Sequence, residues 1–289
     1  MPTIIITGSS GLVGSALVSY FSKLGFQVRA FQRSLPKSNN PSIVYYPFDL
    51  ADVQDRGFKG ADYIVHCAYR PVVSKHDREC MINIDIEGAK KIITLARKHN
   101  IKIVFFSTLA AHPAARSYYG KQKLFSEGLF DVKKDLIIKP GLVLGEGGGL
   151  FGRIASILRN YNLVPLVGRG QQRIQTIALD DLCRIVEVGI KKNIVGKFMI
   201  AHPSPVVMKD LYRYIADKMR KKPLFISIPL TITYYLLLLM ERVGLKLPLT
   251  SQNVLGLEDL KIFDTAPSLE RFGLTIKDYQ TALNQLDLN

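Results

Sequence analysis

The sequence has few cysteines and lacks the short motifs of metal and acyl-transfer chemistry. Its three cysteines, Cys67, Cys80 and Cys183, are odd in number and have no paired-motif spacing. They suggest neither a disulfide framework nor a zinc site, and they fit a reducing compartment such as the cytoplasm. The patterns HExxH, CxxC and the nucleophile elbow do not occur, so we expect no metal ion and no acyl transfer.

The histidines offer no alternative metal site, and no segment interleaves basic with aromatic residues as a nucleic-acid groove would. His76, His99, His112 and His202 have no ligand-like spacing and are expected to be structural or surface residues. The formal net charge is nevertheless +15, from scattered Lys and Arg. This excess is either a solvated surface or attracts an anionic ligand: a phosphorylated cofactor, a nucleotide sugar or an acidic membrane. We expect no nucleic-acid partner.

The longest uncharged run covers 223–240, close to the length of a membrane span. Pro223 and Pro229 break it, and hydroxyl side chains dilute it. We therefore expect a short strand over Leu224–Ile228 and then a packed or amphipathic helix from Leu230. Contact of 224–240 with a membrane surface is the alternative that stays open. The start of the sequence, MPTIIITGSSG, is expected to be a strand and not a signal peptide.

Apolar strands alternate with helical segments in the first half of the chain. Strands are expected over Thr3–Thr7, Gln27–Phe31, Ile43–Tyr46, Tyr63–Cys67 and Ile101–Phe106. Helical spacing covers Leu12–Leu24 and Cys80–His99. Strands that are apolar on both faces and separated by helices predict an α/β fold with a doubly wound parallel sheet. After Leu136–Lys139 the pattern loosens, with helices expected over Phe151–Asn160 and Asp181–Ile190 and an extended segment over Ile174–Leu179.

A glycine-rich turn, Thr7-Gly-Ser-Ser-Gly-Leu-Val-Gly14, follows the first strand and opens the first helix. This is the context of a dinucleotide-binding fingerprint. Gly8 allows the tight turn, Gly11 lets backbone amides approach a pyrophosphate, and Gly14 lets the helix pack closely on the strand. The helix N-terminus adds N–H donors and a positive dipole end. The turn therefore predicts a Rossmann-type nucleotide site.

The spacing TGxxGxxG resembles that of the extended or atypical short-chain dehydrogenases/reductases, the NAD-dependent epimerase/dehydratase family. Further motifs follow in the same order along residues 3 to about 180. They are Asp49-Leu50, His66-Cys67-Ala68, Asn83 within 83–88, Tyr119-Gly-Lys-Gln-Lys123 with Glu127 beyond, and Lys139-Pro140-Gly141-Leu142-Val143-Leu144-Gly145. The resemblance implies an enzyme whose cofactor-binding residues are Gly8, Ser10, Gly11, Leu12, Val13, Arg33, Asp49, Leu50, Ala68, Lys123 and Pro140.

The resemblance also implies two domains. Residues 1–165 would form the dinucleotide-binding Rossmann domain, to which part of 174–200 returns. Residues 166–289 would form most of a smaller substrate-binding region. The sequence leaves the oligomeric state open, a homodimer included.

Tyr119 and Lys123 fit the YxxxK pattern, which implies a catalytic pair. A tyrosine ordinarily ionises near pH 10, and an ammonium one helical turn away favours the phenolate. Tyr119 would then exchange a proton with a substrate oxygen while hydride moves at the nicotinamide. The alternative is an exposed tyrosine–lysine pair on a helix.

The third expected catalytic residue matches the family's pattern less well than Tyr119 and Lys123 do. In Phe106-Ser107-Thr108-Leu109-Ala110 the place of the epimerase serine holds Leu109, so Thr108, or Ser107 beside it, is the expected donor.

Cofactor preference is expected to depend on the end of the second strand. Members of the family that prefer NAD place an acid there, whereas this chain has Gln32 followed by Arg33, with Lys37 close behind. A guanidinium suits the 2′-phosphate of NADP(H), so NADP(H) is favoured and NAD(H) stays open. The alternative is that Arg33 stacks on the adenine of either cofactor.

The substrate is expected to be a nucleotide sugar held by Arg173, which precedes Asp180 by seven residues as in the family's diphosphate-binding segment. The asparagine typical of UDP-sugar epimerases is absent at Lys139-Pro140-Gly141. Two other functions therefore stay open. One is an atypical member that reduces or oxidises a lipid-like ketone, and the other is a non-catalytic NADP-binding scaffold with a degraded site at Leu109.

Overall fold

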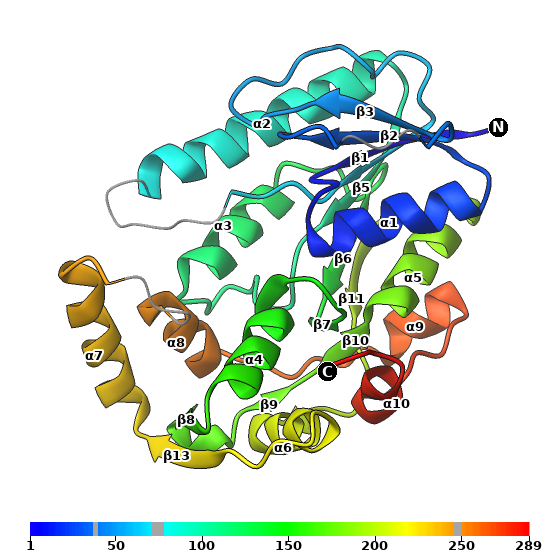
Figure 1. Cartoon of the computed structure of the whole chain (residues 1–289). Coiled ribbons are helices and arrows are strands. Elements are labelled where there is room, and N and C mark those ends of the chain that lie inside the picture. Colours follow the sequence, from blue (N-terminus) through cyan, green and yellow to red (C-terminus); the bar gives the residue numbers. More distant parts are fainter. Residues whose placement is uncertain (37–39, 71–77, 246–249, 289) are drawn as a thin grey trace. The chain divides into compact units, whose positions relative to one another are not determined.

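The computed structural model describes residues 1–36, 40–70, 78–245 and 250–288, and Figure 1 shows the order of the elements along the chain. Lys37, which lies close behind Arg33 in the sequence, and His76, expected to be a structural or surface residue, lie outside the described residues. The described chain divides into two compact units. Unit 1 comprises 1–107, 122–139 and 183–198, and unit 2 comprises 108–121, 140–182 and 199–289. The expected domain division at residue 165 stays a prediction.

A sheet of seven strands, counted among the described residues, organises unit 1, and its order is β11-β6-β5-β4-β1-β2-β3. The strands are β1 (Thr3–Thr7), β2 (Gln27–Gln32), β3 (Ile43–Pro47), β4 (Tyr63–His66), β5 (Lys102–Phe106), β6 (Leu136–Pro140) and β11 (Gly196–Ile200). The pairs β3–β2, β2–β1, β1–β4, β4–β5 and β5–β6 are parallel. The strand order reverses direction at β1, and at this switch point ligands bind outside the carboxyl ends of the strands. The predicted α/β parallel fold is confirmed.

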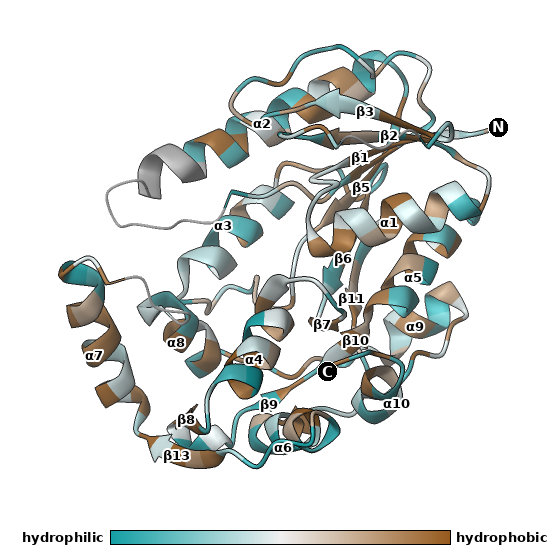
Figure 2. Ribbon diagram, in the orientation of Figure 1, coloured by the Kyte–Doolittle hydropathy of each residue, from teal (hydrophilic) through white to brown (hydrophobic). Residues whose placement is uncertain are grey.

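Helices pack on both faces of this sheet, which explains why its strands are apolar on both sides. Helix α2 (Arg78–Lys98) buries Ala89, Ile92 and Ala96 against sheet residues that include Ile5 and Ile103. Helix α1 (Leu12–Lys23) buries its own apolar stripe, and the Tyr20 hydroxyl donates to Glu187 of α5 (Leu179–Lys191) over 2.5 Å. In Figure 2 the central strands β1 and β2 are largely brown, while α1 and α2 carry both teal and brown residues.

Unit 2 is built from short strand pairs and helices. Its strands are β7 (Leu142–Leu144), β8 (Leu163–Val167), β9 (Arg173–Ile174), β10 (Thr176–Ala178), β12 (Val206–Val207) and β13 (Leu224–Ile228). They pair as β7–β10, β9–β12 and β8–β13. The helices are α4 (Gly149–Asn160), the 3-10 turn η1 (Gly168–Gly170), α6 (Met208–Lys218), α7 (Leu230–Arg242), α8 (Ser251–Glu258), α9 (Ala266–Phe272) and α10 (Tyr279–Asn284). Phe151, Leu211 and Leu283 belong to its principal apolar core.

Helix α3 (Tyr118–Glu127) begins in unit 2 and ends in unit 1, because the division falls between Lys121 and Gln122. The expected strand Leu224–Ile228 and the helix from Leu230 are both present. No helix in the described part of the chain is long and apolar enough to cross a membrane.

Candidate functional site

The glycine turn lies between β1 and α1 and is shaped by two glycines that have no room for a side chain. Gly8 has a φ of +66°, and a Cβ on it would come within 2.8 Å of the Ala68 backbone. A Cβ on Gly14 would come within 2.2 Å of the Gly8 carbonyl oxygen. Helix α1 can therefore begin directly against the turn, as the fingerprint requires.

The start of α1 offers backbone amides to an anion. No side chain caps the helix, and its first turn contains no acidic residue. Ser10 and Gly11 are exposed, while Leu12 and Val13 are partly exposed. A Cβ on Gly11 would meet only the Gly8 carbonyl oxygen, at 3.3 Å, so the approach from solvent is open. The Gly11 amide donates to the Gly8 carbonyl over 2.9 Å, so a pyrophosphate at this turn would accept hydrogen bonds from the amides of Leu12 and Val13 at the start of the helix.

Buried polar contacts fix the loops on either side of the turn. The Thr7 hydroxyl lies 2.8 Å from His66 Nδ1 and accepts a hydrogen bond from the Ala68 amide over 3.2 Å. Burial, with a smaller effect of nearby Lys123, lowers the pKa of His66 to about 3, so the ring is neutral. The hydrogen bond between His66 Nδ1 and the Thr7 hydroxyl locks the segment after β4 against the end of β1.

Arg33 follows β2 and is exposed beside this turn. The Ser9 hydroxyl donates to Gln32 Oε1 over 2.8 Å, and Gln32 Nε2 donates to the Ser34 carbonyl over 2.7 Å. The amide of Gln32 thus ties the glycine turn to the loop that carries Arg33. The positive charge of Arg33 also helps to lower the pKa of Asp49.

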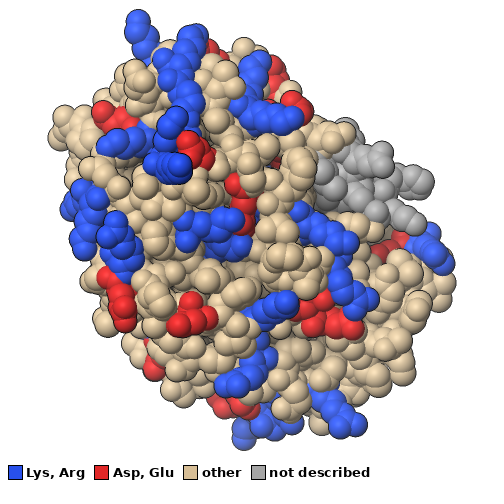
Figure 3. All heavy atoms as spheres, turned by 180° about the vertical axis from the view of Figure 1, so that it is seen from behind, with Lys and Arg blue, Asp and Glu red and all other residues tan. Residues whose placement is uncertain are grey.

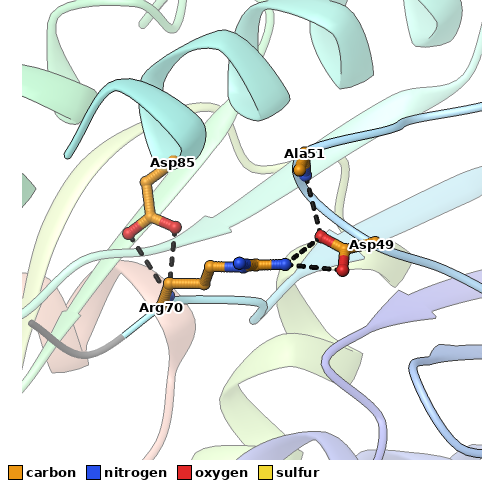
Figure 4. A network of polar contacts seen from close by, with 4 residues as sticks. All are labelled: Asp49, Ala51, Arg70 and Asp85. Atoms are coloured by element: carbon orange, nitrogen blue, oxygen red, sulfur yellow. Dashed lines mark hydrogen bonds and ion pairs between the residues drawn. The ribbon is translucent and has the colours of Figure 1, made fainter. Parts of the chain in front are cut away.

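Asp49, after β3, is held by a residue that the sequence did not single out. Arg70 Nη2 donates to both carboxylate oxygens of Asp49, and the Ala51 amide donates to Oδ1 over 2.9 Å (Figure 4). Burial opposes ionisation of Asp49, but these contacts together with Arg33 hold its pKa below the ordinary value. Leu50, beside it, is buried against Gly88 of α2.

The backbone of Arg70 is held in turn by Asp85 of α2. Its amide donates to the two carboxylate oxygens of Asp85 over 3.0 and 3.3 Å, as Figure 4 shows. Gln122 Nε2 donates to Asp85 Oδ2 over 2.6 Å. Burial raises the pKa of Asp85 to about 6, although the Arg70 amide, the charges of Lys123 and Arg70, and Gln122 act in the other direction. Asp85 thus links the cofactor-side loop to α3.

Lys123 lies on α3 and is buried, with 6% of its surface exposed. Its ammonium donates to the Phe106 carbonyl over 2.9 Å and lies 5.2 Å from the centre of the Tyr69 ring. Burial lowers the pKa of Lys123 to about 8, whereas Asp85 and Glu127 favour its charged form. Because little water screens a buried ammonium, its charge interacts strongly with a nearby phenol or hydroxyl group.

Glu127 anchors the far end of α3 in unit 1. Its carboxylate accepts from the Ser107 hydroxyl and lies 2.7 Å from Lys139 Nζ and 2.8 Å from Lys197 Nζ. Glu127 and Lys139 are buried, so the two lysines balance a carboxylate that would be costly alone. Because the Ser107 hydroxyl already donates to Glu127, Thr108 is the expected catalytic hydroxyl.

Tyr119 and Thr108 meet in unit 2. The Tyr119 side chain forms a hydrogen bond with Thr108, which lowers the phenol pKa, while desolvation raises it by more. The residue is 40% exposed, so part of the ring faces solvent. Leu109, which stands in the place of the epimerase serine, is buried, and its amide donates to the Pro140 carbonyl over 3.0 Å.

Arg173 is exposed in unit 2, where its strand β9 pairs with β12 opposite Val207. A separate hollow of about 490 Å³ lies at the start of α4, between Gly145–Gly149, Arg153, Arg159 and the residues Asp287 and Leu288. None of the predicted site residues lines this hollow, so its size alone does not identify it as the active site.

Unit 1 thus brings together the glycine turn, Arg33, Asp49, Ala68 and Lys123, and unit 2 brings together Tyr119 and Thr108. Arg70, Asp85 and Gln122 also belong to this network, although the sequence motifs do not predict them. Asp85 had a signal: it lies three residues after Ile82 and four before Ala89, on the apolar face of the predicted helix. Asn83, which was matched to the family's helix asparagine, is exposed, whereas Asp85 is buried in the network.

These features define a dinucleotide-binding Rossmann protein, and comparison with known proteins specifies its family. A model of the NAD dependent epimerase/dehydratase family matches residues 4–201. The chain belongs to this family.

Individual proteins of described function are similar to this chain only at low sequence identity. UDP-glucose 4-epimerase of Rickettsia conorii is 29% identical over 124 residues, which cover 37% of this chain and 36% of that protein. The chain thus spans about a third of such a relative. Ceramide reductase of Caulobacter vibrioides is 21% identical over 235 residues, 78% of this chain and 73% of that protein. A solved NAD dependent NDP-hexosamine 5,6-dehydratase matches with a TM-score of 0.74 at 15% identity, covering 100% and 99% of the two chains. At this identity the structural match shows the fold alone.

Proposed function

We propose that this chain is an NAD(P)-dependent oxidoreductase or epimerase of the extended short-chain dehydrogenase type, with Tyr119 and Lys123 as its catalytic pair. The observation that carries the proposal is the buried ammonium of Lys123, four residues after Tyr119 on one helix. The phenol of Tyr119 is bound to Thr108, which is the hydroxyl expected to hold the substrate oxygen. Of the three expected catalytic residues, Lys123 is thus buried, and Tyr119 and Thr108 are hydrogen-bonded to each other.

The roles follow from these environments. When bound, the nicotinamide would donate or accept a hydride. Lys123 would stabilise the phenolate of Tyr119 by its charge, and Tyr119 would exchange a proton with the substrate oxygen. Thr108 would orient that oxygen by a hydrogen bond. His66 stays neutral and positions the loop at Ala68, and Asp85 restrains α3 by accepting a hydrogen bond from Gln122 of that helix.

NADP(H) is the proposed cofactor, with NAD(H) as the alternative. The support is that Gln32, not an acid, ends β2, and that Arg33 is exposed beside the glycine turn. A 2′-phosphate there would meet a guanidinium and no repelling carboxylate at the end of the strand.

A nucleotide sugar is the substrate class we favour. A relative named UDP-glucose 4-epimerase supports it, and an exposed Arg173 is available in unit 2 for a diphosphate. A lipid-like ketone is the second candidate. It is favoured by the exposed apolar side chains of α7 and by similarity to a ceramide reductase.

Turnover with two substrate panels tests this proposal. The purified chain is supplied with NADPH or NAD⁺ and either UDP-sugars or long-chain ketones, and products are identified by mass spectrometry. Tyr119→Phe should reduce the rate by about two to four orders of magnitude, because only the proton-carrying hydroxyl is lost. The matched control is Tyr118→Phe, which keeps the backbone contact to Gln252 and should retain activity. Dinucleotide binding without turnover of either panel would instead favour the non-catalytic scaffold.

A further inference from the structure

Helix α7 has two apolar faces, and only one of them is covered by residues that the structure describes. On the inner face, Thr233 and Leu237 are buried, and Leu230 and Tyr234 pack with them toward Val254 of α8. Glu241 completes this face by accepting from the Ser251 amide over 2.6 Å and from the Ser251 hydroxyl over 2.8 Å. The helix is therefore fixed on α8 by its inner face alone.

The outer face repeats the same helical spacing with exposed apolar side chains. They are Ile232 (58% exposed), Tyr235 (63%), Leu236 (46%), Leu239 (59%) and Val243 (68%). Positions 232, 235, 236, 239 and 243 follow one stripe of an α-helix. Figure 2 shows α7 as largely apolar along its length. An ordinary surface helix would carry polar residues here, so this stripe needs an apolar partner.

Apolar exposure extends to the strand that leads into α7. Leu224 and Ile226 are exposed on the same face of β13, and Leu224 pairs in register with exposed Leu163 of β8. The outer stripe of α7 together with Leu163, Leu224 and Ile226 is called the apolar ridge below.

Exposed basic residues flank the apolar ridge at both ends of its chain segment. Arg220, Lys221 and Lys222 directly precede β13, and Arg242 ends α7. In the described part of the chain, the side chains of these four residues form no ion pair that would neutralise them. Residues 218–245 contain five basic residues and one acid, and that acid, Glu241, is engaged with α8. Figure 3 shows the face turned by 180° from the view of Figure 1, where basic side chains are spread out with acidic ones among them.

We propose that the apolar ridge docks on the surface of a bilayer that contains anionic lipids. Apolar side chains would enter the boundary between headgroups and acyl chains, and the flanking lysines and arginines would contact lipid phosphates. The flanking positive charge decides between occupants, because it matches an anionic lipid surface and would repel the identical basic flank of a second copy. The helix would lie on the membrane and not span it. The proposal does not depend on the catalytic assignment.

Vesicle flotation of the full-length chain tests the lipid and the charge. The wild type should float with vesicles of phosphatidylcholine and phosphatidylglycerol, and much less with phosphatidylcholine alone. Added salt should weaken the interaction, because exposed charges are screened. Lys221→Glu with Lys222→Glu should reduce partitioning by about tenfold or more. The matched control is the adjacent exposed pair Lys133→Glu with Lys134→Glu, which should float like the wild type.

The apolar contribution is tested by Ile232→Gln with Leu239→Gln, which keeps helix propensity while removing two exposed apolar side chains. Partitioning should fall by roughly tenfold to a hundredfold. Val132→Gln, an exposed apolar position outside the ridge, is the control and should have no effect. Thermal melts should be unchanged for all these variants, because the substituted side chains are exposed.

A fluorescence measurement removes ambiguity about which residues enter the lipid. The chain contains no tryptophan, so Tyr235→Trp creates a single reporter. Its emission should shift to shorter wavelength with anionic vesicles, and that of Val132→Trp should not. Three results would each overturn the proposal: no flotation of the wild type, equal flotation with neutral vesicles, or a wild-type dimer that the double glutamine variant converts to a monomer.

Discussion

The guanidinium of Arg70 contacts the carboxylate of Asp49, with 2.5 Å between Nη2 and Oδ2. Asp49 is one of the expected cofactor-binding residues, and the contact joins the chain after β3 to the loop after β4. Both side chains are partly exposed, that of Arg70 by 23% and that of Asp49 by 40%. Asp49 therefore has a fixed orientation on the cofactor side of unit 1.

Loss of this contact should affect binding more than stability. Arg70→Ala should lower the free energy of unfolding by about 1 kcal/mol or less, because partly exposed ion pairs contribute little. Dinucleotide affinity should fall by roughly threefold to tenfold, because Asp49 loses its fixed orientation. Calorimetric titration and a thermal melt measure both effects, with Arg56→Ala as an exposed control. Unchanged affinity in Arg70→Ala would show that Asp49 needs no such support.

Two glycine substitutions should have opposite consequences. Gly11 has φ −82° and ψ 169°, which valine adopts readily, so Gly11→Val should fold but exclude the pyrophosphate. In contrast, Gly14→Ala places a Cβ 2.2 Å from the Gly8 carbonyl oxygen and should destabilise the fold by about 1–3 kcal/mol. Circular dichroism melts and titration with NADP⁺ separate the two. If Gly11→Val bound NADP⁺ as well as wild type, the glycine turn would not be the pyrophosphate site.

Arg33→Ala should change the choice between cofactors. NADP(H) should bind more weakly by about 1.5–3 kcal/mol, the usual size of a hydrogen bond to a charged group, while NAD(H) should be nearly unaffected. The ratio of the two dissociation constants is the measurement. Equal losses for both cofactors would indicate that Arg33 stacks on adenine, and a wild type that prefers NAD(H) would contradict the proposed preference.

The raised pKa of Asp85 predicts a pH dependence of stability. Between its ordinary pKa near 4 and its folded pKa of about 6, the folded state binds more protons than the unfolded state. The free energy of unfolding should therefore decrease as the pH rises through this window, by about 2–3 kcal/mol from this group. Asp85→Asn should flatten that slope in urea titrations from pH 4 to pH 7. A slope that persists in the variant must come from other groups.

Lys123 predicts a change at the alkaline side. With a folded pKa of about 8, its ammonium loses its proton as the pH rises from 7 to 9, and any contact of the charge with a cofactor ribose is weakened. Dinucleotide affinity should decrease over this range. Lys123→Met should bind more weakly at neutral pH and show no such decrease. A wild-type affinity that is constant to pH 9 would place the ammonium away from the cofactor.

The local parts of this structure could be predicted, and the long-range parts could not. Thr3–Thr7, Leu224–Ile228 and the start of α7 at Leu230 follow from apolar periodicity and from prolines, which act within a few residues. The contact of Lys197 with Glu127 depends on a strand that joins the sheet edge much later in the sequence. A sequence pattern gives no distance between such residues. Arg70 likewise has no local signal, because its partner belongs to another loop.

The order in which the chain leaves the ribosome has a consequence for the sheet of unit 1. Strand β11, at the sheet edge beside β6, is made only when residue 200 has been synthesised. Until then β6 has an unpaired edge, and Glu127 lacks its contact with Lys197. The nascent sheet is thus open to pairing with another chain while the segment 140–182 of unit 2 is being translated. Pauses in translation before residue 200 should therefore increase aggregation, whereas pauses after it should not.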